Sequence, residues 1–306
     1  MNQTLSARNI VKHYGGVVAL ANGHLDVKSG EVVALIGANG SGKSTMSKVI
    51  NGVVILDGGQ LLINDKPVQF SSPQAAKDMG ISTVFQELSL IPQMTVADNI
   101  WLTREPKRGL GVINRKEVFE RTQELLALFK GTYKTELTPD TLVSILPPDE
   151  RQIIEILKAI SFDPWMIILD EATASLDSRQ VERLFELVAG WKDQGKANVF
   201  VSHRMEEIFR IADRYSVLRN GETVGTGDIT EVDEKELVRL MVTEETAFAF
   251  SRLPKEAAEE VPERPVCLEI KDLHAGALKC IDLQIREGAL IGLGGLQGQG
   301  QRDLLL

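Results

Sequence analysis

The chain has 306 residues, 43% of them hydrophobic and 25% charged, with a net charge of −9 and a pI near 5.2. This composition is typical of a soluble folded protein and leaves room for one large domain and little more. The acidic balance argues against generic nucleic-acid binding, because a phosphate backbone demands a basic surface. The sequence has no run of 18 apolar residues and no charged-then-apolar start, so we expect no membrane span and no export signal.

The two cysteines, Cys267 and Cys280, both fall near the end of the chain. Neither has a second cysteine or a histidine at the spacing of a metal-binding motif, so we expect two buried, reduced thiols. A disulfide between them is the second interpretation.

The first part of the chain is predicted to form strands. Alternating apolar residues indicate strands over residues 7–11, 17–27 and 32–36, after which a helix begins. Residues 53–85 return to short strands, with turns predicted at Gly58-Gly59 and Asn64-Asp65.

The middle of the chain is predicted to be helical and then to alternate. From about residue 87 to 160 the apolar pattern is helical, with one clear helix over 115–129. Strands are predicted over 165–169 and 197–202, separated by a helix over 181–191. This βαβ pattern implies a parallel sheet, so the fold class is α/β.

A polar segment follows at residues 243–265. It holds six glutamates and three prolines and predicts a solvated linker. We therefore expect a domain over 1–242, a linker over 243–265 and a further domain that starts at 266.

One segment predicts a phosphate-binding loop. Residues 37–44 fit the pattern G-x-x-x-x-G-K-[ST], between a predicted strand and a predicted helix, which disfavours a chance glycine-rich turn. Glycines let backbone N–H groups face phosphate oxygens, Lys43 supplies a cation to the β- and γ-phosphates, and Ser44 can bind Mg²⁺. The candidate nucleotide-binding residues here are Gly37, Ala38, Asn39, Gly40, Ser41, Gly42, Lys43, Ser44 and Thr45.

The same loop recurs 258 positions later without its lysine, as Gly295–Arg302. The segment before it repeats as well, with residues 24–36 aligning with 282–294. A repeat of this period indicates a duplicated domain and is too long for a solenoid unit. We therefore expect residues 266–306 to be the start of a second, degenerate copy, and the chain to be a piece of a twice-repeated protein.

Further candidates follow apolar strands. Residues 167–171 end in Asp170, which suits the shell of Mg²⁺, and Glu171, which can accept a proton from an attacking water. The alternative for these acids is a strand end with a helix-capping carboxylate. Another apolar strand ends at His203, which could contact a γ-phosphate, whereas His13, His24 and His274 are expected to be surface or packing residues.

Together these motifs resemble the ATP-binding-cassette (ABC) ATPases over residues 5–242. The P-loop, the Walker B acids, the D-loop at 174–177 and the switch histidine stand in the family's order. The resemblance implies ATP and Mg²⁺ as cofactors, and an ABC-type P-loop ATPase with a mixed, mainly parallel core sheet, an antiparallel β subdomain and a helical insert at about 87–160. It also assigns Gln86 to the Q-loop that ligates Mg²⁺, and Tyr14 to the aromatic that stacks on adenine; a packing tyrosine is the alternative.

One branch of the family is closer still. Residues 17–22, 81–92 and 94–100, together with the duplication, are similar to the energising subunit of bacterial monosaccharide importers of the ribose, galactose, xylose and rhamnose type. This implies a peripheral protein on the cytoplasmic face of the membrane, with integral-membrane permease subunits, a second cassette in the same chain or in a dimer partner, and indirectly a periplasmic binding protein. The acidic net charge predicts no nucleic-acid partner. A cytosolic ABC ATPase of translation or DNA repair and a regulatory nucleotide-binding module are the alternatives.

The chain departs from the family at the signature motif. Where the family has Leu-Ser-Gly-Gly-Gln, residues 146–150 read Leu-Pro-Pro-Asp-Glu, which is a good helix start but lacks the serine hydroxyl. We expect Asp149 and Glu150 to set negative charge against the opposite cassette's ATP; one such charge about 5 Å from a phosphate oxygen costs about 3 kcal/mol at an effective dielectric of 20. Because a head-to-tail dimer would place this segment against 295–302, the parent protein is predicted to have one hydrolytic and one degenerate site.

Overall fold

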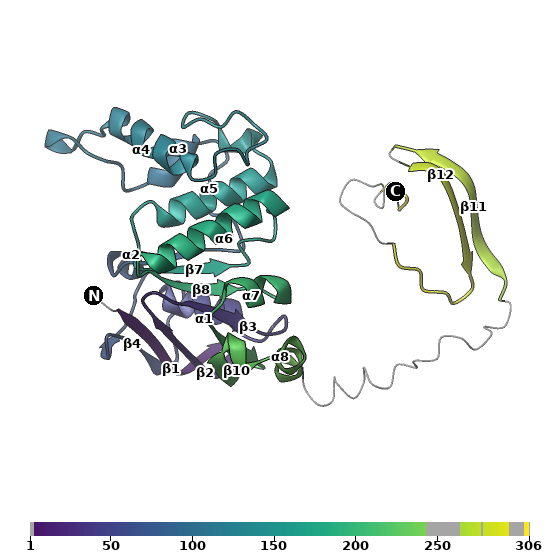
Figure 1. Cartoon of the computed structure of the whole chain (residues 1–306), viewed down its shortest axis with the longest axis horizontal. Helices are drawn as coiled ribbons and strands as arrows, with labels where there is room; N and C mark the ends of the chain where they lie inside the picture. Colours follow the sequence, from purple (N-terminus) through teal and green to yellow (C-terminus); the bar gives the residue numbers. More distant parts are fainter. Residues whose placement is uncertain (1–2, 243–263, 277, 294–302, 306) are drawn as a thin grey trace. The chain divides into compact units, whose positions relative to one another are not determined.

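The computed structural model describes residues 3–242, 264–276, 278–293 and 303–305 (Figure 1). The chain divides into two compact units, Met1–Ala247 and Phe248–Leu306. The predicted linker lies outside the described residues except for its last two positions, and the lysine-free copy of the P-loop lies entirely outside them.

A ten-stranded sheet runs through the first unit in the order β5-β4-β1-β2-β10-β9-β3-β8-β7-β6. One end is antiparallel and consists of β1 (Thr4–Tyr14), β2 (Val17–Lys28), β4 (Gly58–Ile63) and β5 (Lys66–Val68). The other end contains five parallel strands, β3 (Val32–Ile36), β6 (Ile81–Val84), β7 (Met166–Asp170), β8 (Ala197–Val201) and β9 (Arg214–Arg219). Strand β10 (Glu222–Asp228) is antiparallel to β9 and joins the two ends through Glu222 and Asn22.

Eight α-helices are described in this unit. They are α1 (Lys43–Ile50), α2 (Pro73–Asp78), α3 (Val96–Trp101), α4 (Arg115–Ala127), α5 (Pro148–Ile160), α6 (Ser178–Asp193), α7 (Met205–Ile211) and α8 (Glu234–Met241). Short 3₁₀ turns lie at Gly109–Gly111, Val143–Ile145 and Ile229–Glu231. The first unit therefore has the mixed sheet, antiparallel strands and helical insert that the sequence predicts.

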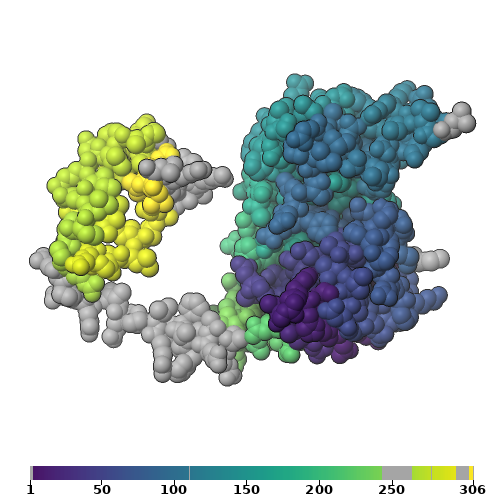
Figure 2. Space-filling model, turned by 180° about the vertical axis from the view of Figure 1, so that it is seen from behind, coloured from purple at the N-terminus to yellow at the C-terminus, as the bar shows by residue number. Residues whose placement is uncertain are grey.

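The buried strands serve two apolar cores because successive side chains point to opposite faces. In β3, Val32, Ala34 and Ile36 join the core beneath α5 and α6, whereas Val33 and Leu35 join the core around α1. Figure 1 shows α5 and α6 on one side of β7 and β8, and α3 and α4 at the far end from β1, β2 and β4. In Figure 2 the same division appears on the surface, with the purple N-terminal strands below and the teal helical insert above.

Two local predictions were wrong. The sequence did not reveal α2, whose first turn is capped by Ser72 with a proline at the start of the helix. Gly58-Gly59 is the beginning of β4 and not a turn. Gly59 has φ +85°, and a Cβ there would lie 2.2 Å from the Asn9 carbonyl oxygen, so the glycine permits close approach of β1 and β4.

The described part of the second unit is a β-hairpin, β11 (Val266–Ala275) and β12 (Leu278–Arg286). Residues 290–293, which align with residues 32–35 of β3 in the first unit, form no strand. In the first unit β3 lies between β8 and β9, and within the described residues of the second unit no strand offers such pairing.

The prediction of buried cysteines was wrong, since Cys267 and Cys280 are both exposed and unpaired. Both lie on the hairpin, where the described residues include no second layer that would cover them. Among the residues that the structure describes, no helix is long and apolar enough to cross a bilayer.

The helical insert is held together by a buried polar contact. The Trp101 indole Nε1 donates to Thr122 Oγ1 over 2.9 Å, and that hydroxyl donates to the Val118 carbonyl. Trp101 and Thr122 are 6% and 0% exposed, so water cannot replace either bond. The pair fixes α3 against α4.

Replacing Thr122 with valine should destabilise the insert. The change nearly conserves volume but leaves the buried indole N–H without an acceptor, at a cost of about 1–3 kcal/mol. Urea unfolding followed by tryptophan fluorescence measures the loss, with the exposed Thr226→Val as the matched control. Equal midpoints for the two variants would contradict the importance of this bond.

Candidate nucleotide-binding site

A cleft of about 520 Å³ lies at the carboxyl edge of the parallel strands. Because parallel strands all end at one edge, the loops after β3, β6, β7 and β8 converge there. Ten of the predicted site residues line the cleft, namely Tyr14, Asn39, Gly40, Gly42, Lys43, Ser44, Thr45, Gln86, Glu171 and His203. Segments from the whole length of the first unit thus meet at one place.

The P-loop leads directly into α1, whose first turn has no side-chain cap. Gly42, at the N-cap position, has φ 109° and offers no side-chain cap, so the N–H groups of the first turn have no capping partner. A Cβ at Gly42 would lie 2.7 Å from the Ala19 carbonyl oxygen, so there is no room for a side chain at this position. Unpaired amides and the positive helix end suit an anion.

Lys43 lies over the loop that it follows. Its Nζ donates to the carbonyl oxygens of Gly37 and Ala38, at 2.8 and 3.0 Å. Burial lowers the pKa of the Lys43 ammonium, while the charges of Glu171 and Asp170 oppose that change. The lysine is therefore a desolvated cation held beside two acids, a setting in which a phosphate is a strong partner.

Asp170 lies beneath the cleft at the end of β7 and does not line it. Burial raises the pKa of the Asp170 carboxyl to about 6, the charge of Glu171 adds to the rise, and Lys43 and Ser44 oppose it. Its Oδ1 is buried without a hydrogen-bond partner. A buried carboxylate oxygen without a partner, next to a hydroxyl, suits a hard cation.

Glu171 lies between two other predicted catalytic residues. Gln86 Nε2 donates to Glu171 Oε2 over 2.8 Å, and His203 Nδ1 lies 3.4 Å from Glu171 Oε1. Glu171 has φ 51°, a left-handed conformation that is uncommon for a residue with a side chain. The backbone thus turns this carboxylate out of β7, whereas the preceding Asp170 stays buried.

The cleft has an apolar wall that sequence reasoning missed. Val17, Val18 and Ala19, at the start of β2, line the cleft beside Tyr14. Tyr14 pairs with Val17 across the hairpin, and both are exposed, at 44% and 66%. The sequence places two valines close after Tyr14, the predicted adenine contact. Exposed apolar residues on a strand often mark a binding surface, so Val17 and Val18 could have indicated this wall.

Three predicted loop residues do not line this cleft. They are Gly37, Ala38 and Ser41. A Cβ at Gly37 would lie 2.3 Å from both the Leu218 carbonyl oxygen and Ser41 Oγ, so a side chain has no room there. Ala38 and Ser41 line a neighbouring pocket together with Asn39 and Gly40.

The signature-like segment begins α5, as the sequence predicted. Pro147 is the N-cap residue and supplies no side-chain bond, and Pro148 is the first helical residue. The segment therefore offers neither a hydroxyl nor the N–H groups of these two positions to a ligand.

The expected outward negative charge of this segment is a wrong prediction. Asp149 and Glu150 are 7% and 0% exposed and point inward. Asp149 accepts from Lys134 Nζ and Gln180 Nε2, and Glu150 accepts from the backbone N–H groups of Lys134 and Thr135. Burial would raise the pKa of Asp149, but the bonds from Lys134 and Gln180 outweigh it and hold that pKa below its usual value. Both acids are thus used to fasten α5 to the preceding loop and to α6.

Comparison with known sequences agrees with this geometry. The family described as ABC transporter matches residues 20–174. A protein of Burkholderia cenocepacia, provisionally named a ribose/galactose/methyl galactoside import ATP-binding protein, is 41% identical over 98% of this chain and 56% of its own length. The ribose import ATP-binding protein RbsA 1 of Rhizobium johnstonii is 40% identical over 97% of this chain and 57% of its own. The chain thus spans little more than half the length of these curated relatives.

Solved structures give the same fold. An ATP-binding cassette of an ABC transporter in its ADP conformation superimposes with a TM-score of 0.63 and 26% identity, over 78% of this chain and 98% of the other. A dimeric bacterial ABC transporter cassette superimposes with a TM-score of 0.65 and 26% identity, over 74% and 98%.

Replacing Lys43 with alanine should weaken ATP binding by roughly 10- to 100-fold, because hydrogen bonds to charged groups contribute about 1.5–3 kcal/mol. Titration calorimetry of the chain measures the affinity, with the exposed Lys66→Ala as the control. Unchanged affinity in the Lys43 variant would remove the lysine from the phosphate site.

The Mg²⁺-free chain should show a pH dependence that comes from Asp170. The pKa of this group is about 6 in the folded chain and about 4 when unfolded, so protonation stabilises the fold at low pH and this contribution is lost as the pH rises through 6. Asp170→Asn should remove the change in the free energy of unfolding between about pH 4 and pH 6. It should also raise that free energy at pH 7 by about 1–3 kcal/mol.

Denaturant unfolding in EDTA between pH 4 and 7 measures both effects. Glu124→Gln, which changes an exposed acid on α4, is the matched control. If Asp170→Asn and Glu124→Gln changed the free energy of unfolding by the same amount at every pH, the assignment of the pH dependence to Asp170 would be wrong.

Proposed function

Because the chain belongs to the ABC transporter family, we propose that it is the nucleotide-binding part of a subunit that hydrolyses ATP to energise the import of a monosaccharide. The observation that carries this proposal is the convergence of Lys43, Glu171, Gln86 and His203 on one cleft. The names of its relatives support import of a ribose- or galactose-type sugar over a role in translation or DNA repair.

The two ends of the cleft suit the two parts of a nucleotide, its phosphates and its base. At one end the free amides of α1 and the Lys43 ammonium would hold the phosphates. At the other end Tyr14, Val17 and Val18 offer an aromatic ring and an apolar surface, which suit the flat face of adenine. ATP therefore fits with its base against the β1–β2 hairpin and its phosphates over the loop.

The residues present fit a Mg²⁺ ion. Asp170, Ser44 and Gln86 would hold it through oxygen atoms, which Mg²⁺ prefers, and the buried Oδ1 of Asp170 has no other partner. Bound Mg²⁺ would supply positive charge to the β- and γ-phosphates.

Glu171 is the proposed general base. Its side chain is 17% exposed and lies at the cleft, where it could take a proton from a water that attacks the γ-phosphorus. His203 and Gln86 hold its two oxygens from either side and would fix its orientation. His203 would also reach the γ-phosphate from the end of β8.

The parent protein would pair two unequal cassettes. In the first cassette the signature segment has lost its donors to Pro147 and Pro148, while Asp149 and Glu150 fill an internal role. In the second repeat the P-loop lacks its lysine. These two losses fall on opposite sides of the same composite site, so a single hydrolytic site, built on Lys43 and Glu171, would power transport.

The proposed partners follow from an import role. They are integral-membrane permease subunits, a second cassette and, indirectly, a periplasmic binding protein, with this subunit on the cytoplasmic face of the membrane. A dimeric cassette among the similar structures supports pairing of cassettes.

In the full-length transporter, Glu171→Gln should lower steady-state ATP turnover by about 10²–10⁴ and leave ATP binding in place, since that range is typical of a positioned base. Phosphate release and nucleotide affinity are measured side by side, with Glu87→Gln in the neighbouring loop as the control. Turnover near the wild-type rate would exclude Glu171 as the base.

The chain of residues 1–306 alone should bind ATP but hydrolyse it slowly, because loss of even one preorganised donor typically costs about 10²–10³ in rate. Pro147→Ser restores a hydroxyl and an N–H without disturbing the buried acids, and should raise turnover. Adding Glu171→Gln should abolish that gain. Fast, cooperative ATPase activity of the unmodified chain would contradict the unequal pair.

A further inference from the structure

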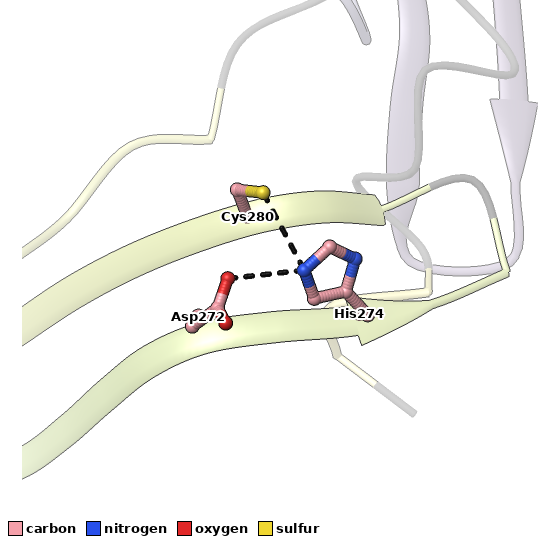
Figure 3. A group of neighbouring side chains, drawn as sticks. All are labelled: Asp272, His274 and Cys280. Carbon is pink, nitrogen blue, oxygen red and sulfur yellow. Dashed lines mark hydrogen bonds and ion pairs between the residues drawn. The ribbon is translucent and has the colours of Figure 1, made fainter.

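Three side chains of metal-ligand type meet on the β11–β12 hairpin, and none of them lines the nucleotide cleft. Asp272 and His274 come from β11 and Cys280 comes from β12 (Figure 3). His274 Nε2 lies 3.0 Å from Asp272 Oδ1 and 3.4 Å from Cys280 Sγ. The three possible ligand atoms all lie within 4.8 Å of one another.

The backbone of the hairpin brings these residues together. Asp272 and His274 are two positions apart on β11, and their side chains meet (Figure 3). The pairing shifts on both sides of Leu273, and Asp272 and Cys280 have left-handed φ values of 48° and 53°. The Asp282 carboxylate accepts from the Asp272 backbone N–H over 2.8 Å and fixes this irregular segment. Irregular pairing of this kind commonly serves to redirect side chains.

The first hairpin repeats this geometry and acts as an internal comparison. Its pairs Ala7–Leu25 and Ile10–Gly23 correspond to Ile270–Leu283 and Leu273–Ile281 of the second hairpin, by the 258-residue repeat of β2 and β12. Asn9 then corresponds to Asp272 and Asn22 to Cys280. Asn9 also has a left-handed φ, 52°, and its Nδ2 donates to Asn22 Oδ1 over 3.2 Å.

The two hairpins have the same backbone geometry at these positions but carry different side chains. Asn9 and Asn22 stay exposed although their hairpin lies inside a ten-stranded sheet, so the position is one that a complete domain leaves open. The second hairpin has aspartate and cysteine at these two places and His274 at the position of Val11. The substitutions replace an amide pair with three ligands of transition metals.

We propose that Asp272, His274 and Cys280 form a binding site for a zinc-like divalent transition-metal ion. Zinc accepts thiolate, imidazole and carboxylate ligands at about 2.0–2.3 Å in a tetrahedron, which places neighbouring ligand atoms roughly 3.3–3.6 Å apart. The observed distances of 3.0 and 3.4 Å need only small side-chain movements to match. Solvent would fill the fourth position.

The donor set also defines the class of ion. A thiolate and an imidazole favour zinc, cobalt or copper over Mg²⁺ and Ca²⁺, which prefer oxygen ligands. On binding, the Cys280 thiol releases its proton to solvent, and the neutral His274 ring carries its proton on Nδ1, so that the Nε2 lone pair is free to bind the ion. The site is thereby distinct in chemistry from the Mg²⁺ site proposed at Ser44 and Asp170.

The decisive test is protection of one thiol in the whole chain. In a Cys267→Ser chain, Cys280 is the single cysteine, and Zn²⁺ without nucleotide should slow its alkylation by iodoacetamide, because the bound thiolate is no longer a free nucleophile. The matched control is Cys280→Ser, which leaves Cys267, also exposed, as the single cysteine. Zinc should not change the alkylation rate of that chain.

Ligand variants complete the test. Loss of an outer-shell partner alone typically weakens metal binding by about 10–100-fold, so His274→Ala should raise the zinc concentration needed for protection by at least that factor. Asp272→Asn should raise it as well, and His203→Ala should not. In the Co²⁺-loaded chain, a thiolate-to-metal absorption band should vanish with Cys280→Ser. Zinc binding by calorimetry without protection of Cys280, or full protection in the His274 variant, would overturn the proposal.

Discussion

The first unit depends on the fact that four parallel strands end at a common edge. Strands β3, β8, β7 and β6 are neighbours in the sheet, and predicted site residues lie at or directly after the end of each strand. The P-loop follows β3, His203 follows β8, Asp170 and Glu171 end β7, and Gln86 follows β6. No single segment could build the cleft, because its residues come from separate parts of the chain between Tyr14 and His203. The apolar cores on both faces of the sheet keep that edge in place.

Electrostatics at this edge are set by unequal burial of two adjacent acids. Asp170 continues the buried strand and keeps a raised pKa, whereas Glu171 turns outward with a left-handed φ. Lys43 lies near both and loses part of its own hydration to burial. A site that holds a desolvated cation and a desolvated carboxylate without full pairing favours ligands that carry both signs of charge, as a nucleotide with a divalent cation does.

The signature-like segment keeps a helix start although its two prolines supply neither a hydroxyl nor an N–H group. Pro148 and the acids after it suit the first turn of α5, and the structure uses the acids to hold Lys134, Thr135 and Gln180. A sequence pattern of two acids at a helix start is consistent with outward or inward side chains. The inward direction depends on Lys134 and on the two backbone N–H groups before α5, which lie about 15 residues away and carry no recognisable motif.

Much of the first unit was determined by sequence alone. The strands β3, β7 and β8, the helices α4 and α6, the P-loop and the order of the motifs follow from local periodicity and from residue types that act through their own backbone. The roles of Lys43, Gln86, Asp170, Glu171 and His203 remain predictions, although all but the buried Asp170 line one cleft.

Tertiary structure decided what local pattern could not. The exposure of Cys267 and Cys280, the inward turn of Asp149 and Glu150, and the place of Val17 and Val18 in the cleft wall each depend on which distant segment lies opposite. The meeting of Asp272, His274 and Cys280 depends on the register of a hairpin whose pairing shifts on both sides of Leu273. Burial, hydrogen-bond partners and ligand geometry are properties of pairs of segments, and a sequence read along one strand or helix at a time does not contain them.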